Sequence, residues 1–226
     1  ASGPAEVEAS LDVLEREFQD LSGTQPEHLR PEDPLMPEPG VDVHVAMERE
    51  QVHVFLGHPG IRRDHPDFYS LMVMDYILGT GPGFTSRISK RLRDEMGLCY
   101  SVNAAITSSA GEEPGVFAAY IGTSPEHREK AIDGFCEEID RIRGELVTEK
   151  ELQDVQDYLT GSYIFGFERN TQLARYAVRA KRFGLGFDYI HRYPELIRAV
   201  TCEDVQRVAQ KHLHPDRMVR VSAGAS

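Results

Sequence analysis

The stretch from Gly79 to Val102, GTGPGFTSRISKRLRDEMGLCYSV, constrains the fold most, because it specifies a break, a helix, a turn and a strand in immediate succession. Its opening glycines are suited to ending a preceding helix and to letting the chain turn close to its neighbours. The following helix is predicted to end at Gly97, and a strand is predicted from about Leu98. The apolar face of this helix carries Phe84, Ile88 and Leu92. The more solvated sides carry Arg87, Lys90, Arg91 and Arg93.

Two polar residues of this stretch are candidates for chemistry. Arg93 falls in the last helical turn, and Tyr100 falls at the start of the strand, seven residues later. An arginine at a helix C-terminus gains about 0.3–1 kcal/mol from the helix dipole without any further role. Tyr100 shares its strand face with three apolar positions, which also suits a half-buried core tyrosine. Taken alone, the residues leave structural and catalytic roles open for both side chains.

Hydrophobic periodicity along the remaining chain predicts runs of strands and runs of helices. Strands are expected at 41–47, 52–56, 98–108, 116–121 and 217–223. Further helices are expected at 5–21, 66–78, 124–143, 148 onward, 170–183, 187–199 and 201–213. Thr148 and Glu151 have the spacing of a capping box. Because strands and helices do not alternate strictly, we predict an α+β fold, in which an antiparallel sheet is covered by several helices.

A proline-rich segment indicates the domain organisation. Prolines at positions 26, 31, 34, 37 and 39 prevent a helix or a central strand, so residues 23–40 are predicted to be an extended linker. The preceding helix, within residues 1–22, is then expected to end a preceding half-domain. Residues 41–226 are expected to form the compact domain.

Composition and charge exclude several classes of function. The net charge is −12, whereas a nucleic-acid-binding protein presents a basic face, so no nucleic-acid partner is expected. No apolar run approaches the roughly 20 residues needed to span a bilayer. The three cysteines are scattered and indicate reduced thiols. We expect a soluble protein, and a cytoplasmic location is favoured over a periplasmic or organellar one.

Metal-binding motifs are missing from the sequence. Neither His-x-x-Glu-His nor His-Glu-x-x-His occurs. His44 and His53 fall on strands expected to be adjacent, but without a third ligand they are better interpreted as exposed sheet residues. His212 and His214 fall near a helix C-terminus, where a cation suits the dipole. We therefore expect no metal to be bound by this segment.

The segment LGTGPGFTSRISKRLRDEMGLCYSV resembles the signature of the pitrilysin/insulinase family of zinc metallopeptidases, the inverzincins that include relatives of the mitochondrial processing peptidase. In that family a glycine-rich break and a Ser-Arg-Leu-like helix start precede Leu-Arg-x-x-x-Gly-Leu-x-Tyr-Ser-Val. The resemblance covers about Val41 to Ala223 and includes the TEKELQDVQ and TCEDVQRVAQKHLHPDRMVRV segments. Ile88 departs from the pattern, since many relatives have leucine there.

The resemblance implies one half of a clam-shaped peptidase built from two homologous halves. One half binds zinc through the inverted motif, and the other binds no metal and contributes an arginine and a tyrosine seven residues apart. Because the inverted motif is missing, this chain resembles the C-terminal, metal-free half of a zinc metalloendopeptidase. Arg93 and Tyr100 match the pair, which implies that they contact a substrate carbonyl and the oxyanion.

The same resemblance implies two partners. The first is a zinc-bearing homologous half, either upstream in the same polypeptide or on a separate subunit. The second is an extended peptide substrate. This segment alone is expected to be inactive, since zinc stays in the partner half.

Two other interpretations remain. Some members of the family are non-catalytic scaffolds or substrate-presenting subunits, although the retained Arg93 and Tyr100 argue against a pure scaffold. An unrelated α+β binding module would require the long signature to be a coincidence.

Overall fold

The computed structural model describes residues 7–20 and 32–225. A five-stranded sheet has the order β1-β5-β2-β4-β3. Its strands are β1 (Asp42–Ala46), β2 (Val52–Pro59), β3 (Val102–Ala105), β4 (Val116–Thr123) and β5 (Val219–Gly224). All strand pairs are antiparallel except the edge pair β1–β5, which is parallel. The predicted α+β fold with an antiparallel sheet is therefore confirmed, with one parallel exception.

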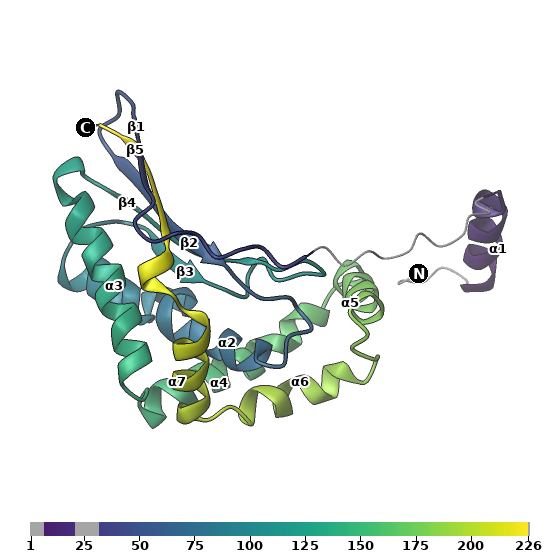
Figure 1. The fold of residues 1–226 in the computed structure, drawn as a ribbon. Coiled ribbons are helices and arrows are strands. Elements are labelled where there is room, and N and C mark those ends of the chain that lie inside the picture. Colours follow the sequence, from purple (N-terminus) through teal and green to yellow (C-terminus); the bar gives the residue numbers. More distant parts are fainter. Residues whose placement is uncertain (1–6, 21–31, 226) are drawn as a thin grey trace.

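Helices cover one face of the sheet (Figure 1). The longer ones are α2 (Phe68–Asp75), α3 (Arg128–Gly144), α4 (Glu149–Tyr163), α5 (Asn170–Arg182), α6 (Tyr189–Arg198) and α7 (Cys202–His212). Short helical segments are η1 (Tyr76–Thr80), η2 (Pro82–Phe84), η3 (Ser89–Glu95), η4 (Pro125–His127), η5 (Ile164–Phe167) and η6 (Pro215–Arg217). Helix α3 packs on β2 and β4, while α7 packs on α2 and α3. Helices α4 and α6 pair with each other farther from the sheet.

Alternation along the central strands places the core on the helix-covered face. In β2, Val54 and Leu56 are buried, and their cross-strand partners in β4, Ile121 and Ala119, are buried as well. Residues between them, such as Phe55, point to the helix-free face and are exposed. The two-residue periodicity of these strands is what separates the two faces.

The N-terminal helix α1 (Val7–Phe18) has no buried residue. Its apolar side chains are exposed at the helical spacing predicted from the sequence: Val7, Leu11, Leu14 and Phe18. Residues 32–40 of the predicted linker contain no helix or strand, and residues 23–31 lie outside the described residues. Within the described part of the chain, no helix has the length and apolarity that a bilayer span requires.

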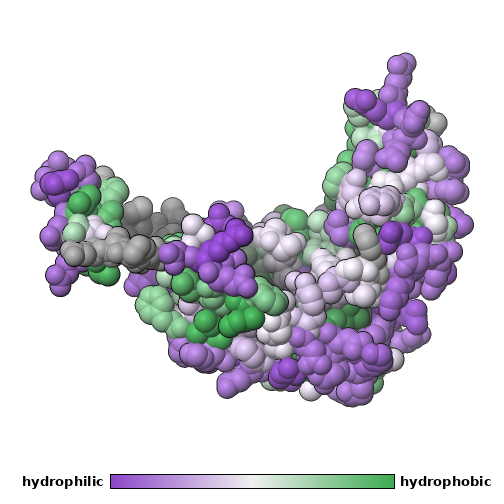
Figure 2. All heavy atoms as spheres, turned by 180° about the vertical axis from the view of Figure 1, so that it is seen from behind, coloured by the Kyte–Doolittle hydropathy of each residue, from purple (hydrophilic) through white to green (hydrophobic). Residues whose placement is uncertain are grey.

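A second group of exposed apolar side chains gathers over α5 (Figure 2). It comprises Ile164, Phe165, Leu173, Val178 and Phe187. These residues belong to η5, α5 and the turn before α6.

Candidate functional site

The glycine-rich break fits tightly against β3. Gly79 lies in η1, and a Cβ at this position would come within 2.2 Å of the backbone oxygen of Ala104. Glycine is the residue that fits there without moving the strand. The chain then enters η3, which carries Arg93. Both η1 and η3 are π-helical, a rare geometry that occurs often at functional sites.

The helix that carries Arg93 is fixed by its buried face. Ile88 and Leu92 are fully buried, which confirms these two positions of the predicted apolar face. Leu92 lies against α3 at Gly134, where an added Cβ would be 2.3 Å from Leu92 Cδ2. The small residue on α3 therefore allows the two helices to approach closely.

Arg87 differs from the prediction, because its side chain is largely buried. Its Nε and Nη2 atoms donate to the two carboxylate oxygens of Glu151, at 2.8 and 2.9 Å. Glu151 also closes the predicted capping box of α4 with Thr148. Burial opposes ionisation of Glu151, but the hydrogen bonds from Arg87 and Thr148 lower its pKa to about 2. Counting helical positions places Arg87 off the apolar face but cannot reveal a partner 64 residues away.

A tight corner joins η3 to the next strand. Gly97 has φ of +64°, a left-handed conformation that favours glycine at the end of a helix. The N–H groups of Gly97 and Leu98 donate back to the carbonyls of Arg93 (3.2 Å) and Leu92 (2.9 Å). The hydroxyl of Thr123, at the end of β4, donates to the carbonyl of Leu98 at 2.8 Å. The corner is thus held by both the helix and the sheet.

This corner brings Arg93 and Tyr100 together. The Cζ atom of Arg93 lies 5.8 Å from the centroid of the Tyr100 ring, within the range of a cation–π contact. Tyr100 is 83% exposed, so the interpretation as a half-buried core tyrosine is wrong. The strand begins later than predicted, at Val102, so Tyr100 lies before it. The alternation of buried and exposed side chains within the strand therefore does not apply to Tyr100. The Arg93 side chain is 27% exposed, and its Nη1 is 3.7 Å from Asp94 Oδ1.

The chemistry available at the corner is hydrogen-bond donation. A guanidinium and a phenol are both donors at neutral pH and suit a carbonyl oxygen or an oxyanion. The neighbouring Cys99 does not offer a thiolate, because burial raises its pKa to about 11 despite the opposing charge of Arg93. The corner can therefore bind and polarise, and it contains no evident nucleophile among the side chains described around it.

Comparison with known families now identifies the domain. Residues 1–159 match the family described as the peptidase M16 inactive domain. The chain belongs to this family. The family resemblance read from the glycine-rich signature is therefore confirmed.

Relatives in this family carry the name of zinc proteases. An uncharacterized zinc protease of Bacillus subtilis is 29% identical over 129 residues, which is 57% of this chain and 31% of the relative. An uncharacterized zinc protease of Streptomyces coelicolor is 29% identical over 124 residues, 55% of this chain and 26% of the relative. The matched segments thus span about a third or less of the length of these relatives.

Solved structures support the same fold. A peptidase M16 inactive domain from Pseudomonas fluorescens superposes with a TM-score of 0.84 at 25% identity, covering 98% of this chain and 52% of that chain. A protease from Helicobacter pylori has a TM-score of 0.77 at 17% identity, covering 98% and 54%, and this likeness concerns the fold alone.

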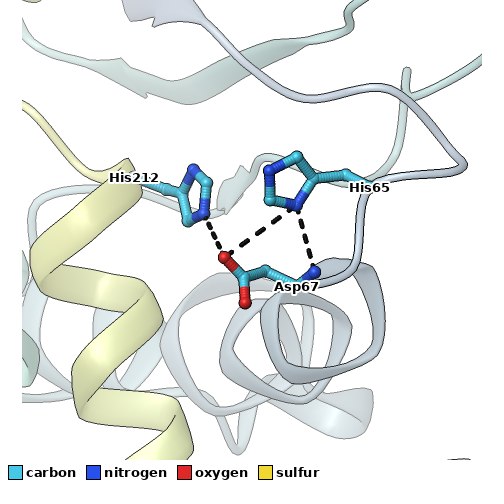
Figure 3. A group of neighbouring side chains, drawn as sticks. All are labelled: His65, Asp67 and His212. Atoms are coloured by element: carbon cyan, nitrogen blue, oxygen red, sulfur yellow. Dashed lines mark hydrogen bonds and ion pairs between the residues drawn. The ribbon is translucent and has the colours of Figure 1, made fainter.

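A zinc site requires His, Cys or carboxylate ligands gathered around one point. The described residues bring together one group of potential ligands, His65, Asp67 and His212 (Figure 3). Asp67 already accepts hydrogen bonds from Arg207 (2.7 Å), Lys211 (2.8 Å) and His212 (2.8 Å). Burial opposes its ionisation, but these three partners hold the pKa of Asp67 well below its usual range.

These contacts do not suit a zinc ion. A bound cation would lie beside Arg207 and Lys211, and His65 Nδ1 already accepts the backbone N–H of Asp67 at 3.0 Å. The group instead joins α7 to the start of α2. His212 was expected as a cation at a helix end, but burial lowers its pKa even though Asp67 opposes the shift.

The other histidine pair is separated by the sheet order. β5 lies between β1 and β2, so the expectation that His44 and His53 lie on adjacent strands is wrong. His44 contacts Ser222 at 2.9 Å, and His53 contacts Tyr120 at 2.8 Å. Strand order depends on long-range pairing, which alternation within each strand does not encode.

Proposed function

We propose that this chain is the metal-free half of a two-half zinc metalloendopeptidase and that Arg93 and Tyr100 contact its peptide substrate. The observation that carries the proposal is the corner itself, where a guanidinium lies 5.8 Å from a phenol ring that is 83% exposed. A core tyrosine or a simple helix-dipole arginine would not require this exposure. Membership of the inactive-domain family supports the assignment to the metal-free half.

In this proposal the two side chains have distinct roles. The Tyr100 hydroxyl donates a hydrogen bond to the oxyanion that develops on the scissile carbonyl. Arg93 holds a neighbouring peptide carbonyl and orients the phenol. Preorganised donors of this kind stabilise a transition state more than a ground state, by about 2.7–4 kcal/mol for one oxyanion donor. The zinc of the other half would supply the Lewis acid and the activated water.

A partner half also accounts for two features of the chain. The apolar stripe of α1 has no buried residue, which suits a helix that ends a preceding half-domain and packs there. The relatives named zinc proteases are about three times as long as the matched segment, which leaves room for a second half. The substrate would bind as an extended peptide, by adding a strand to a sheet edge of the partner half.

Substituting Arg93 tests the proposal. In the full-length protein together with its zinc-bearing half, Arg93→Ala should lower kcat/KM for an unstructured peptide roughly 10- to 100-fold, because a charge-assisted hydrogen bond is lost. Lys90→Ala is the matched control, since Lys90 is an exposed cation on the same helix. Equal activity of the Arg93 variant and the wild type would contradict the proposed contact. A wild-type assembly that cleaves no peptide would favour the scaffold or substrate-presenting subunit.

A further inference from the structure

A second candidate site lies away from the Arg93–Tyr100 corner. A cavity of about 670 Å³ lies between α2, α4, α5 and α6, and neither Arg93 nor Tyr100 lines it. This volume is within the range of small-molecule sites. Its wall is rich in aromatic rings: Tyr76, Tyr163, Phe167, Tyr176, Tyr189 and Tyr193.

A buried arginine forms part of the cavity lining. Arg63, in the loop before α2, is only 5% exposed and lines the cavity. Its Cζ lies 3.8 Å from the centroid of the Phe68 ring. Its Nη2 donates to the hydroxyls of Tyr189 (3.1 Å) and Tyr69 (3.3 Å), while its Nε is buried without a hydrogen-bond partner.

No acidic side chain among residues 7–20 and 32–225 forms an ion pair with Arg63. A guanidinium stays protonated, and a buried charge is costly unless it is paired. Among the ion pairs of the described residues, none involves Arg63. Asp75 lines the same cavity, but its oxygens accept hydrogen bonds from Ile106 and Thr107. Burial raises the pKa of Asp75 to about 6, and among the described residues its carboxylate forms no ion pair with Arg63.

A second donor in the cavity also lacks a partner. The hydroxyl of Tyr163 is buried and makes no hydrogen bond, although its ring stacks on Tyr193 with centroids 4.0 Å apart. Burial raises the pKa of Tyr163 to about 12, so the hydroxyl keeps its proton, and Arg63 is near enough to oppose this shift. Arg175 and Arg179 of α5 add positive charge to the lining.

We propose that this cavity binds a small organic anion, namely a carboxylate carried on a flat apolar body. The carboxylate would accept from Arg63 Nε and the Tyr163 hydroxyl, which supplies the missing counter-charge and satisfies both donors. The apolar body would lie among the aromatic rings. An inorganic anion would leave the aromatic side chains of the cavity exposed to water. A neutral aromatic molecule would leave the guanidinium unpaired.

Calorimetric titration of the full-length protein tests this proposal with three probes: phenylacetate, its neutral isostere phenylacetamide, and inorganic phosphate. Phenylacetate should bind about tenfold more tightly than either of the others. It alone has both a carboxylate to pair with Arg63 and an apolar ring to pack on the aromatic side chains. Equal affinities for phenylacetate and phenylacetamide would overturn the proposal. So would tighter binding of phosphate, or no binding of phenylacetate at ten millimolar, a concentration roughly tenfold above a millimolar Kd.

Substitutions assign the binding to this cavity. Arg63→Met should abolish phenylacetate binding, and Tyr163→Phe should weaken it about tenfold while keeping the ring and its stacking. Arg198→Gln is the matched control, because Arg198 is exposed, pairs with Asp157 and does not line the cavity. If Arg63→Met fails to fold, Tyr163→Phe decides the question. Unchanged phenylacetate affinity in a folded Tyr163→Phe protein would refute the assignment.

Discussion

Arg93 and Arg63 both lie beside aromatic rings, but in opposite environments. At the corner, Arg93 Cζ is 5.8 Å from the centroid of Tyr100, whose side chain is exposed. In the cavity, Arg63 Cζ is 3.8 Å from the centroid of Phe68, and the arginine is buried. An exposed donor pair can meet a macromolecular partner such as a peptide. A buried pair can meet only a ligand small enough to enter the fold.

The two regions also differ in what they contribute to stability. The Tyr100 side chain is largely hydrated and the Arg93 side chain partly so, and removing the Tyr100 hydroxyl should change activity and leave folding nearly unaffected. Arg63 carries a desolvated charge without a counter-ion, so the fold gains little from it. Arg87 is also mostly buried, but unlike Arg63 it has a carboxylate partner. It therefore provides a reference for the stability contribution of a paired arginine.

The largest expected loss of stability comes from a substitution at Gly79, which lies next to both the corner and the cavity. Gly79 lies in η1, which lines the cavity through Tyr76 and Thr80 and leads into the helix of Arg93. A Cβ there would meet three backbone atoms of Ala104 at 2.2–2.8 Å. Gly79→Ala should therefore lower the free energy of unfolding by about 3 kcal/mol. Urea denaturation measures this change.

Gly144→Ala provides the control for that substitution. Gly144 ends α3, and nothing lies within 4 Å of an added Cβ. Its free energy of unfolding should stay within about 0.5 kcal/mol of the wild type. Similar losses for the two variants would show that the close approach of Gly79 to Ala104 is unimportant.

A smaller effect is expected from the paired arginine. Arg87→Met should lower the free energy of unfolding by about 1–3 kcal/mol at pH 7, less than for a fully buried pair because Glu151 is partly exposed. The pKa of Glu151 is lowered from 4.5 to about 2 in the folded state. Its contribution is therefore present above about pH 4.5 and is lost as the pH falls towards 2.

Denaturation of both proteins at pH 7 and pH 3 measures this dependence. The stability difference between the wild type and Arg87→Met should shrink at pH 3. Arg182→Met, which removes an exposed partner of Glu112, should change stability by less than about 1 kcal/mol. A difference that stays constant with pH would contradict the role assigned to the Arg87–Glu151 pair.

The smallest effect is expected from the unpaired buried arginine. Arg63→Met should change the free energy of unfolding by less than about 1 kcal/mol in either direction, since the loss of the cation–π contact and of the hydrogen bonds to Tyr69 and Tyr189 is offset by removal of an unpaired buried charge. Thermal denaturation in the absence of added carboxylates measures it. A loss as large as that of Arg87→Met would mean that Arg63 is a structural residue.

The corner could be predicted from the sequence because its determinants are local. Gly97, the apolar face of the preceding helix and the seven-residue spacing all lie within one short stretch. The exposure of Tyr100 could not be predicted by alternation, because the strand begins at Val102 and Tyr100 lies before it. Helix starts with local caps, such as Thr148, could also be predicted.

The cavity could not be predicted, because its contacts are distant in sequence. Arg63 and Tyr189 are 126 residues apart, and no periodicity links them. The strand order could not be predicted for the same reason, since β5, from the far end of the chain, lies between β1 and β2. Burial of a charged residue depends on the packing of several elements, which single-segment patterns do not describe.

The central claim is that the exposed corner supplies a catalytic donor to a zinc peptidase. Its most direct test is kcat for an unstructured peptide, measured on Tyr100→Phe in the full-length protein with its zinc-bearing half. The account predicts a loss of about 100-fold, with unchanged thermal stability and zinc content. Tyr158→Phe, which removes an exposed hydroxyl from α4, should behave as the wild type. Wild-type turnover by Tyr100→Phe would contradict the account.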